Sequence, residues 1–208
     1  MSSNPATPAE ATGPVIGGEP FREAGASTST SALTPLLAAV VLGAAISLSL
    51  GVYGRVHTPT GGSITTFGFP AVLPMKAWFT TVAAALGIGQ AVSAAWLWGR
   101  LPGVGPAPSS LGTWHRWLGT VAFFFTLPVA YHCLWALGFQ QTTTRVLLHS
   151  LFGCAFYGAL AAKLLLLRSP HLPGWTLPAA GGLLVAVLTG IWFTSSLWFF
   201  TNVGFPGV

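Results

Sequence analysis

Two histidines, His132 and His149, carry the residue type and spacing that most clearly support chemistry in this chain. They lie on two long apolar segments joined by the turn FQQTTT, and each is about five residues from that turn. At about 1.5 Å of rise per residue, both imidazoles lie about 7 Å along their helices from the connection. Two neutral imidazoles at one level on antiparallel helices are what a six-coordinate haem iron requires. The spacing therefore predicts His132 and His149 as axial ligands of one b-type haem.

The surrounding sequence suits such a site. Gly153 follows His149 by one turn on the same face and leaves room for the porphyrin edge, while Pro128, one turn before His132, can kink its helix. Helices in contact pack at about 8–10 Å, so the hairpin must splay to admit a porphyrin between two imidazoles. In this interpretation each ring binds iron through Nε2 and donates Nδ1–H to a backbone carbonyl. The aromatic side chains that could wall the ring are Tyr131, Trp135, Phe152 and Phe156.

Other roles for the same residues stay open at this stage. The two histidines could be hydrogen-bonded across a helix interface or face the lipid headgroups, or they could hold copper or zinc together with Cys133. Arg145 and Lys76 are candidate partners for haem propionates, or plain interfacial anchors. A second haem would have to use His115 and His171. Since His171 lies between two prolines in a loop, we expect one haem per chain.

Composition identifies the setting of these residues as a membrane. The chain has 208 residues, of which 52% are hydrophobic and 5% charged, and its mean hydropathy is +0.70. All three acidic residues lie in the first 23 positions. Lys and Arg are scattered singly at the ends of apolar stretches, which argues against binding of nucleic acid. The sequence predicts an all-α bundle of five transmembrane helices, each long enough to cross about 30 Å of hydrocarbon, at about 33–54, 77–98, 114–137, 146–167 and 177–200.

Residues 1–30 are rich in Ala, Gly, Pro, Ser and Thr and have no apolar period, so we expect a disordered tail before a transmembrane domain over residues 31–208. Five Lys or Arg residues on the tail side against three on the other favour a cytoplasmic N-terminus and an external C-terminus in a plasma membrane. The histidine pair then lies toward the outside.

A family resemblance points the same way. The segment HRWLGTVAFFFTLPVAYH resembles the third helix of ferric reductase-like transmembrane domains, and the hairpin over about 112–165 is similar to cytochrome b561-type bundles. The whole chain, including LPGWTLPAAGG, is similar to an uncharacterised actinobacterial membrane family. The resemblance implies a haem-ligand role for His132 and His149. The chain departs from these families at Lys163, where a second histidine of the helix would stand.

These observations predict a small membrane cytochrome that passes single electrons between the quinone pool, or a membrane partner, and an extracytoplasmic acceptor. At a six-coordinate iron this transfer needs no general acid or base, which agrees with the absence of carboxylates from the spans. The alternative is a non-catalytic membrane subunit or assembly factor with structural histidines.

Overall fold

The computed structural model describes residues 28–63 and 65–204, and in these ranges every regular element is a helix. Two helices carry a π-helical segment, labelled η. The expected disordered tail lies outside the described residues, except that Thr28–Thr30 already belong to the first helix. The elements are α1 (Thr28–Val56), α2 (Val72–Leu97), α3 (Leu111–Tyr131), η1 (His132–Leu137), α4 (Thr144–Leu167), α5 (Thr176–Trp192), η2 (Phe193–Leu197) and α6 (Trp198–Asn202).

Five helices are long and apolar enough to cross a membrane, which confirms the predicted fold class. They cover Ala32–Val56, Val72–Leu97, Leu111–Leu137, Thr144–Leu167 and Thr176–Asn202. The second span begins five residues earlier than the sequence pattern suggests, and so includes Lys76 in its second turn. Pro74 is tolerated there because the N–H groups of the first helical turn have no intrahelical acceptor.

The helices pack in the order α1, α4, α5, α2, α3 rather than in chain order. α1 and α4 approach each other closely where Gly43 and Gly158 face each other. A Cβ added to Gly43 would lie 2.8 Å from the carbonyl oxygen of Gly158, so neither position has room for a side chain. Small residues thus bring these two backbones together, as glycines commonly do between membrane helices.

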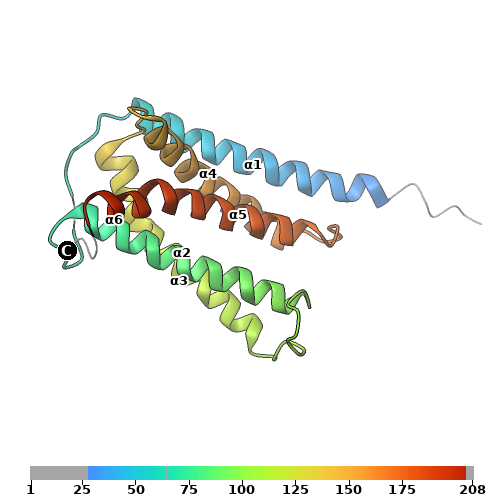
Figure 1. Cartoon of the computed structure of the whole chain (residues 1–208). Coiled ribbons are helices and arrows are strands. Elements are labelled where there is room, and N and C mark those ends of the chain that lie inside the picture. The colour runs from blue at the N-terminus through green and yellow to red at the C-terminus, as the bar shows by residue number, and fades with distance from the viewer. Residues whose placement is uncertain (1–27, 64, 205–208) are drawn as a thin grey trace, which may run out of the picture.

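The predicted hairpin exists, but its two arms do not pack along each other. α3 packs against α2, whereas α4 lies between α1 and α5. Figure 1 shows α2 and α3 leaning away from the other three long helices toward the end that carries the 98–110 loop. The arms therefore diverge toward the 98–110 loop, whereas at the histidine end they stay close, with Cys133 Sγ 4.0 Å from Nε2 of His149.

Both π-helical segments lie at the same end of the bundle. Pro128 precedes η1 by one turn, and its carbonyl oxygen accepts the hydrogen bonds of both the backbone N–H and the Nδ1–H of His132. η2 interrupts the fifth span just after Trp192. π-helical turns are rare and often occur at functional sites, so the space between the two segments is a candidate functional site.

Candidate functional site

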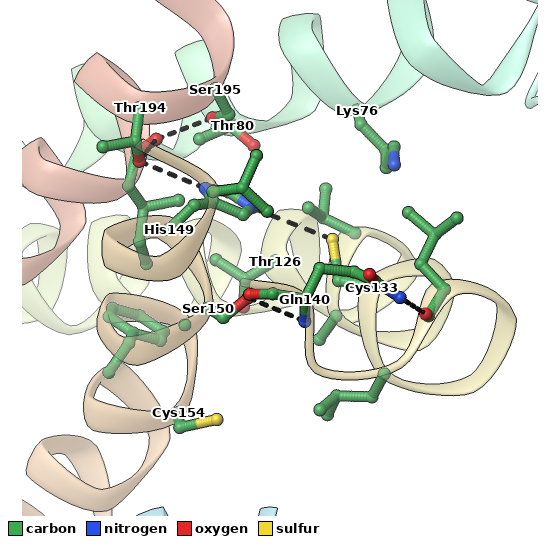
Figure 2. A pocket seen from close by; sticks show the side chains of 18 of the residues that line it. Lys76, Thr80, Thr126, Cys133, Gln140, His149, Ser150, Cys154, Thr194 and Ser195 are labelled. Carbon is green, nitrogen blue, oxygen red and sulfur yellow. Dashed lines mark hydrogen bonds between the residues drawn. The ribbon is translucent and has the colours of Figure 1, made fainter. Parts of the chain in front are cut away.

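A cavity of about 250 Å³ lies inside the bundle between α2, α3, α4 and α5, near the end that carries the 138–143 turn. Its walls are mostly apolar, and Phe156, Leu188 and Ile191 are among them. A smaller set of polar groups comes from α2, α3, α4, both π segments and the 138–143 turn, as Figure 2 shows for those it labels. These polar lining residues are Lys76, Thr80, Thr126, Cys133, Gln140, Arg145, His149, Ser150, Tyr157, Thr194 and Ser195.

His149 lines this cavity, and its hydrogen bonds define its tautomer. Its Nδ1 lies 3.2 Å from Oγ1 of Thr194. That hydroxyl has one proton, which it directs to the carbonyl oxygens of Gly190 (2.7 Å) and Ile191 (3.1 Å). Oγ1 of Thr194 must therefore accept from Nδ1–H, so that Nε2 of His149 keeps its lone pair. The lone pair is the part of an imidazole that binds a metal.

His132 has the same tautomer by a different route. Its Nδ1 lies 2.9 Å from the carbonyl oxygen of Pro128, which can only accept, so Nδ1 carries the proton. The ring is 2% exposed, and its Nε2 has no hydrogen-bond partner in the described part of the chain. A buried nitrogen without a partner calls for an explanation, such as an ion or ligand that it binds.

The two histidines lie at the same depth, but they do not line the same cavity. Cys133, the neighbour of His132, places its Sγ 4.0 Å from Nε2 of His149, which confirms that both arms carry their histidine at the same depth. His149 and Cys133 line the cavity, whereas His132 is buried beside it. Among the described residues, no three His, Cys, Asp or Glu side chains converge on a possible metal ion. The structure thus gives no support to a copper or zinc site built with Cys133.

Two cations, Lys76 and Arg145, border the same cavity. Lys76 has no hydrogen-bond or ion-pair partner in the described ranges. The Arg145 guanidinium donates to the carbonyl oxygen of Thr194 (2.6 Å) and lies 4.1 Å from the ring centroid of Trp198. With no Asp or Glu side chain in residues 24–208, the site is positively charged. It therefore suits a ligand with an apolar body and acidic substituents.

Gly153 lines the cavity and has open space above its Cα, because a Cβ built there would meet no atom within 4 Å. This is the room that the sequence interpretation required. Three of the four predicted aromatic walls do not line the cavity, and two of these, Tyr131 and Trp135, stack on each other outside it. Of the other two, Phe156 lines the cavity, and Phe152 packs against Gly190.

The residues of the possible second site stay separate in the structure. His115 is hydrogen-bonded to Oγ of Ser93 (2.9 Å), and its carbonyl oxygen accepts from the Gln90 amide (2.6 Å). His171 is exposed in the loop between α4 and α5, with a φ of 60°. No contact joins the two histidines in the described ranges. His115 is thus satisfied by neighbours on α2.

Sequence reasoning missed the contribution of the fifth span. Thr194 orients His149, and Ser195 and Trp198 line the same cavity. The available signal was the polar run TSS in an otherwise apolar stretch. Cys133, considered from the sequence as a possible copper or zinc ligand, also faces the cavity.

Comparison with known proteins places the chain in one family. Residues 36–207 match the model described as "Family of unknown function (DUF6529)", and the chain belongs to that family. Comparisons with curated proteins and with solved structures gave no match.

Proposed function

We propose that this protein is a membrane b-type cytochrome that holds one haem through His132 and His149 and transfers single electrons. The observation that carries the proposal is the matched state of the two imidazoles. Each donates Nδ1–H to a protein oxygen. Nε2 of His132 has no hydrogen-bond partner among the described residues, and the contact of Nε2 of His149 is the Sγ of Cys133 at 4.0 Å. Metal-ligating histidines normally have this arrangement, because the bond at the other nitrogen orients the ring.

The remaining features of the cavity fit the same ligand. Gly153 leaves space on α4, and the apolar walls suit a macrocycle. Lys76 and Arg145 provide two positive charges for two propionates at the end where the cavity approaches the turn. A porphyrin between the two rings requires Cys133 to move away from His149. The backbones of α3 and α4 do not run side by side, and the two helices meet through side chains such as Tyr157, whose hydroxyl lies 3.0 Å from Oγ1 of Thr126.

A bound haem would supply one-electron exchange at iron, and the protein would supply position and environment. Pro128 and Thr194 would fix the two imidazole planes, and the apolar walls would exclude water. No side chain needs to move a proton, in agreement with a site that contains no carboxylate. The electron would pass between the quinone pool, or another membrane partner, and an acceptor at the face that holds the turn.

The proposed orientation places that face outside the cell. Arg100, Arg116 and Arg168 lie on the opposite side of the bundle, with Lys163 one turn from the end of its helix, and Arg22 precedes the first span in the sequence. The face near the site holds Arg55, Lys76 and Arg145. Cytoplasmic loops carry the excess of positive charge in membrane proteins, which favours a cytoplasmic N-terminus.

Single substitutions of each ligand test the function. Protein purified in mild detergent should be red, with a sharp reduced-minus-oxidised α band. His132→Ala and His149→Ala should each abolish that band. Insertion should persist, because both spans remain long and apolar. His115→Ala is the matched control, since it removes a histidine from the same span as His132 without touching the cavity.

A colourless wild-type protein would refute the proposal and favour the alternative, a membrane subunit or assembly factor with structural histidines. Either ligand variant that keeps a full six-coordinate low-spin spectrum would exclude that histidine as a ligand.

A further inference from the structure

A groove on the outside of the bundle shares a wall with the central cavity. It lies between α1 and α3, has a volume of about 510 Å³ and is lined by apolar and aromatic side chains. Ala130, Leu134 and Tyr157 line both the groove and the cavity. α1 packs on α4 and touches η1, but it makes no comparable contact with α3 in the described ranges. The groove is thus the space left between α1 and α3, and one layer of side chains separates it from the cavity.

The groove faces the hydrocarbon of the membrane. Its other lining residues belong to the first and third spans and carry no charge: Ile46, Leu50, Tyr53, Leu127, Tyr131 and Trp135. Leu127 is 39% exposed and Trp135 42% exposed, so the groove is open to its surroundings. In a bilayer these surroundings are lipid chains rather than water. An apolar molecule dissolved in the membrane can therefore reach the wall of the cavity without crossing an aqueous phase.

The end of the cavity toward the membrane surface is covered by hydrogen-bonded segments. Oγ of Ser150 donates to the carbonyl oxygen of Gln140 (2.9 Å) and accepts from its N–H (3.3 Å), which fixes the 138–143 turn over the cavity. A π-helical segment leaves carbonyl oxygens without their usual helical donors. Two such oxygens of η1 accept from backbone N–H groups of the 57–61 loop (3.1 and 3.3 Å). Entry from water would have to break these bonds.

The wall between the groove and the cavity, in contrast, is closed by side chains alone. Tyr157 reaches from α4 to α3, where its hydroxyl lies 3.0 Å from Oγ1 and 3.1 Å from the carbonyl oxygen of Thr126. Leu134 extends toward α1 and lies next to Gly54. Ala130 adds only a methyl group to the wall. Rotation of such side chains is fast and requires no movement of a helix, so this wall is the easier one to open.

We propose that a lipid-soluble carboxylic acid enters the central cavity sideways from the bilayer, through the groove between α1 and α3. Inside the cavity, Lys76 and Arg145 supply positive charge for the carboxylate, and apolar walls that include Phe156 and Leu188 contact the rest of the ligand. The inference goes beyond the proposed function, and it requires neither haem nor a ligand role for His132. It names the phase from which the ligand comes, and so excludes water-soluble anions.

Cys133 can report on entry into the cavity. It lines the cavity, and its Sγ lies 4.0 Å from Nε2 of His149, which can accept the thiol proton. In a Cys154→Ala background it is the only thiol of the chain. A maleimide adds the sulfur to one carbon of its double bond and the thiol proton to the other, and the intact mass of the protein records the product.

Two maleimides that enter from different phases are compared on the haem-free protein in lipid nanodiscs. N-dodecylmaleimide, which partitions into the bilayer, should label Cys133. A sulfonated maleimide, which stays in water, should leave Cys133 unlabelled while it labels Thr143→Cys in the exposed turn. Decanoic acid should protect Cys133 from N-dodecylmaleimide, and decanol at the same concentration should not, because only the acid is attracted by Lys76 and Arg145.

Two substitutions in the wall should change the rate of labelling by N-dodecylmaleimide in opposite directions. Tyr157→Phe removes the hydroxyl that binds Thr126 and should raise the rate about two- to tenfold, the equivalent of one hydrogen bond. Ala130→Phe adds a ring to the wall and should lower the rate at least about fivefold, because a close-packed interior leaves little other space to pass. Leu48→Phe is the control, since Leu48 is 68% exposed on α1 and does not line the groove.

Labelling in dodecyl sulfate, where the protein is unfolded, should be equally fast in all variants. Labelling of Cys133 by the sulfonated maleimide as fast as that of Thr143→Cys would show entry from water and overturn the proposal. Equal rates in Tyr157→Phe, Leu48→Phe and the wild type would also overturn it, even if Ala130→Phe fails to assemble. Equal protection by decanoic acid and decanol would refute the acidic ligand. None of these rates depends on whether the protein binds haem, so the two proposals fail separately.

Discussion

Gly153 provides the sharpest test of where the ligand lies. It lines the cavity beside His149, and a Cβ at this position would meet no atom within 4 Å. A cavity of about 150 Å³ can hold a benzene molecule. A phenyl ring introduced by Gly153→Phe would therefore occupy more than half of the 250 Å³ found here. If the porphyrin shares that space, haem occupancy should fall at least about tenfold, or about 1.4 kcal/mol in binding free energy.

Gly153→Ala is the matched control for this substitution. A single methyl group fits the open space, and alanine in place of a helix-interior glycine stabilises a helix by roughly 0.5–1 kcal/mol. The alanine variant should bind haem at the wild-type level, with an equal or slightly higher thermal midpoint. Haem per chain is measured by the pyridine haemochrome assay on purified protein, and folding by size-exclusion profile and helical circular dichroism.

Two results would refute the reasoning. Full haem occupancy in a folded Gly153→Phe protein would show that the ligand does not use this side of the cavity. Equal loss of haem in Gly153→Ala and Gly153→Phe would show that the position matters for another reason than space, since the methyl group meets no neighbour.

Three further expectations concern stoichiometry, topology and packing. The haem-to-chain ratio should be one and should not change in His115→Ala; a ratio near two that falls to one in this variant would reveal a second site. In intact cells, and in a background without the native cysteines, an impermeant thiol reagent should label a cysteine at Thr143 and not one at Ser109. The reverse pattern would place the site at the cytoplasmic face. Gly158→Leu should destabilise the bundle by about 1–3 kcal/mol, because its side chain would overlap the backbone of Gly43; an unchanged thermal midpoint would contradict the packing of α1 on α4.

The fold could be predicted from the sequence because membrane spans depend mainly on length and apolar composition. All five spans are found, and their ends differ from expectation by a few residues where helices extend into polar flanks. α2, for example, begins at Val72, since Pro74 is acceptable in a first turn although it would end a helix elsewhere. The order in which the helices pack could not be predicted in this way. That α4 packs on α1 and α5, and not along α3, depends on which small-residue faces meet in space.

The candidate site was predicted in part, for a related reason. Residue type and spacing along a hairpin are enough to place His132 and His149 at one depth, and to put Lys76 and Arg145 at the same end. The direction in which each side chain points is not encoded so simply. The π-helical segment that starts at His132 changes the direction of the side chains that follow, so that Cys133 faces the cavity. No simple periodicity in the sequence announces such a segment.

The two π-helical segments also explain why this end of the bundle is shaped as it is. Well under 1% of residues in proteins adopt this conformation, yet this chain has segments of six and five residues that flank one cavity. η1 carries Cys133 and His132, while η2 carries Thr194, which orients His149. Each segment gives up regular helical hydrogen bonds, and the 57–61 loop replaces some of them at η1. A bundle needed only to span the membrane would gain nothing from this arrangement, whereas a bundle that must orient two imidazoles would.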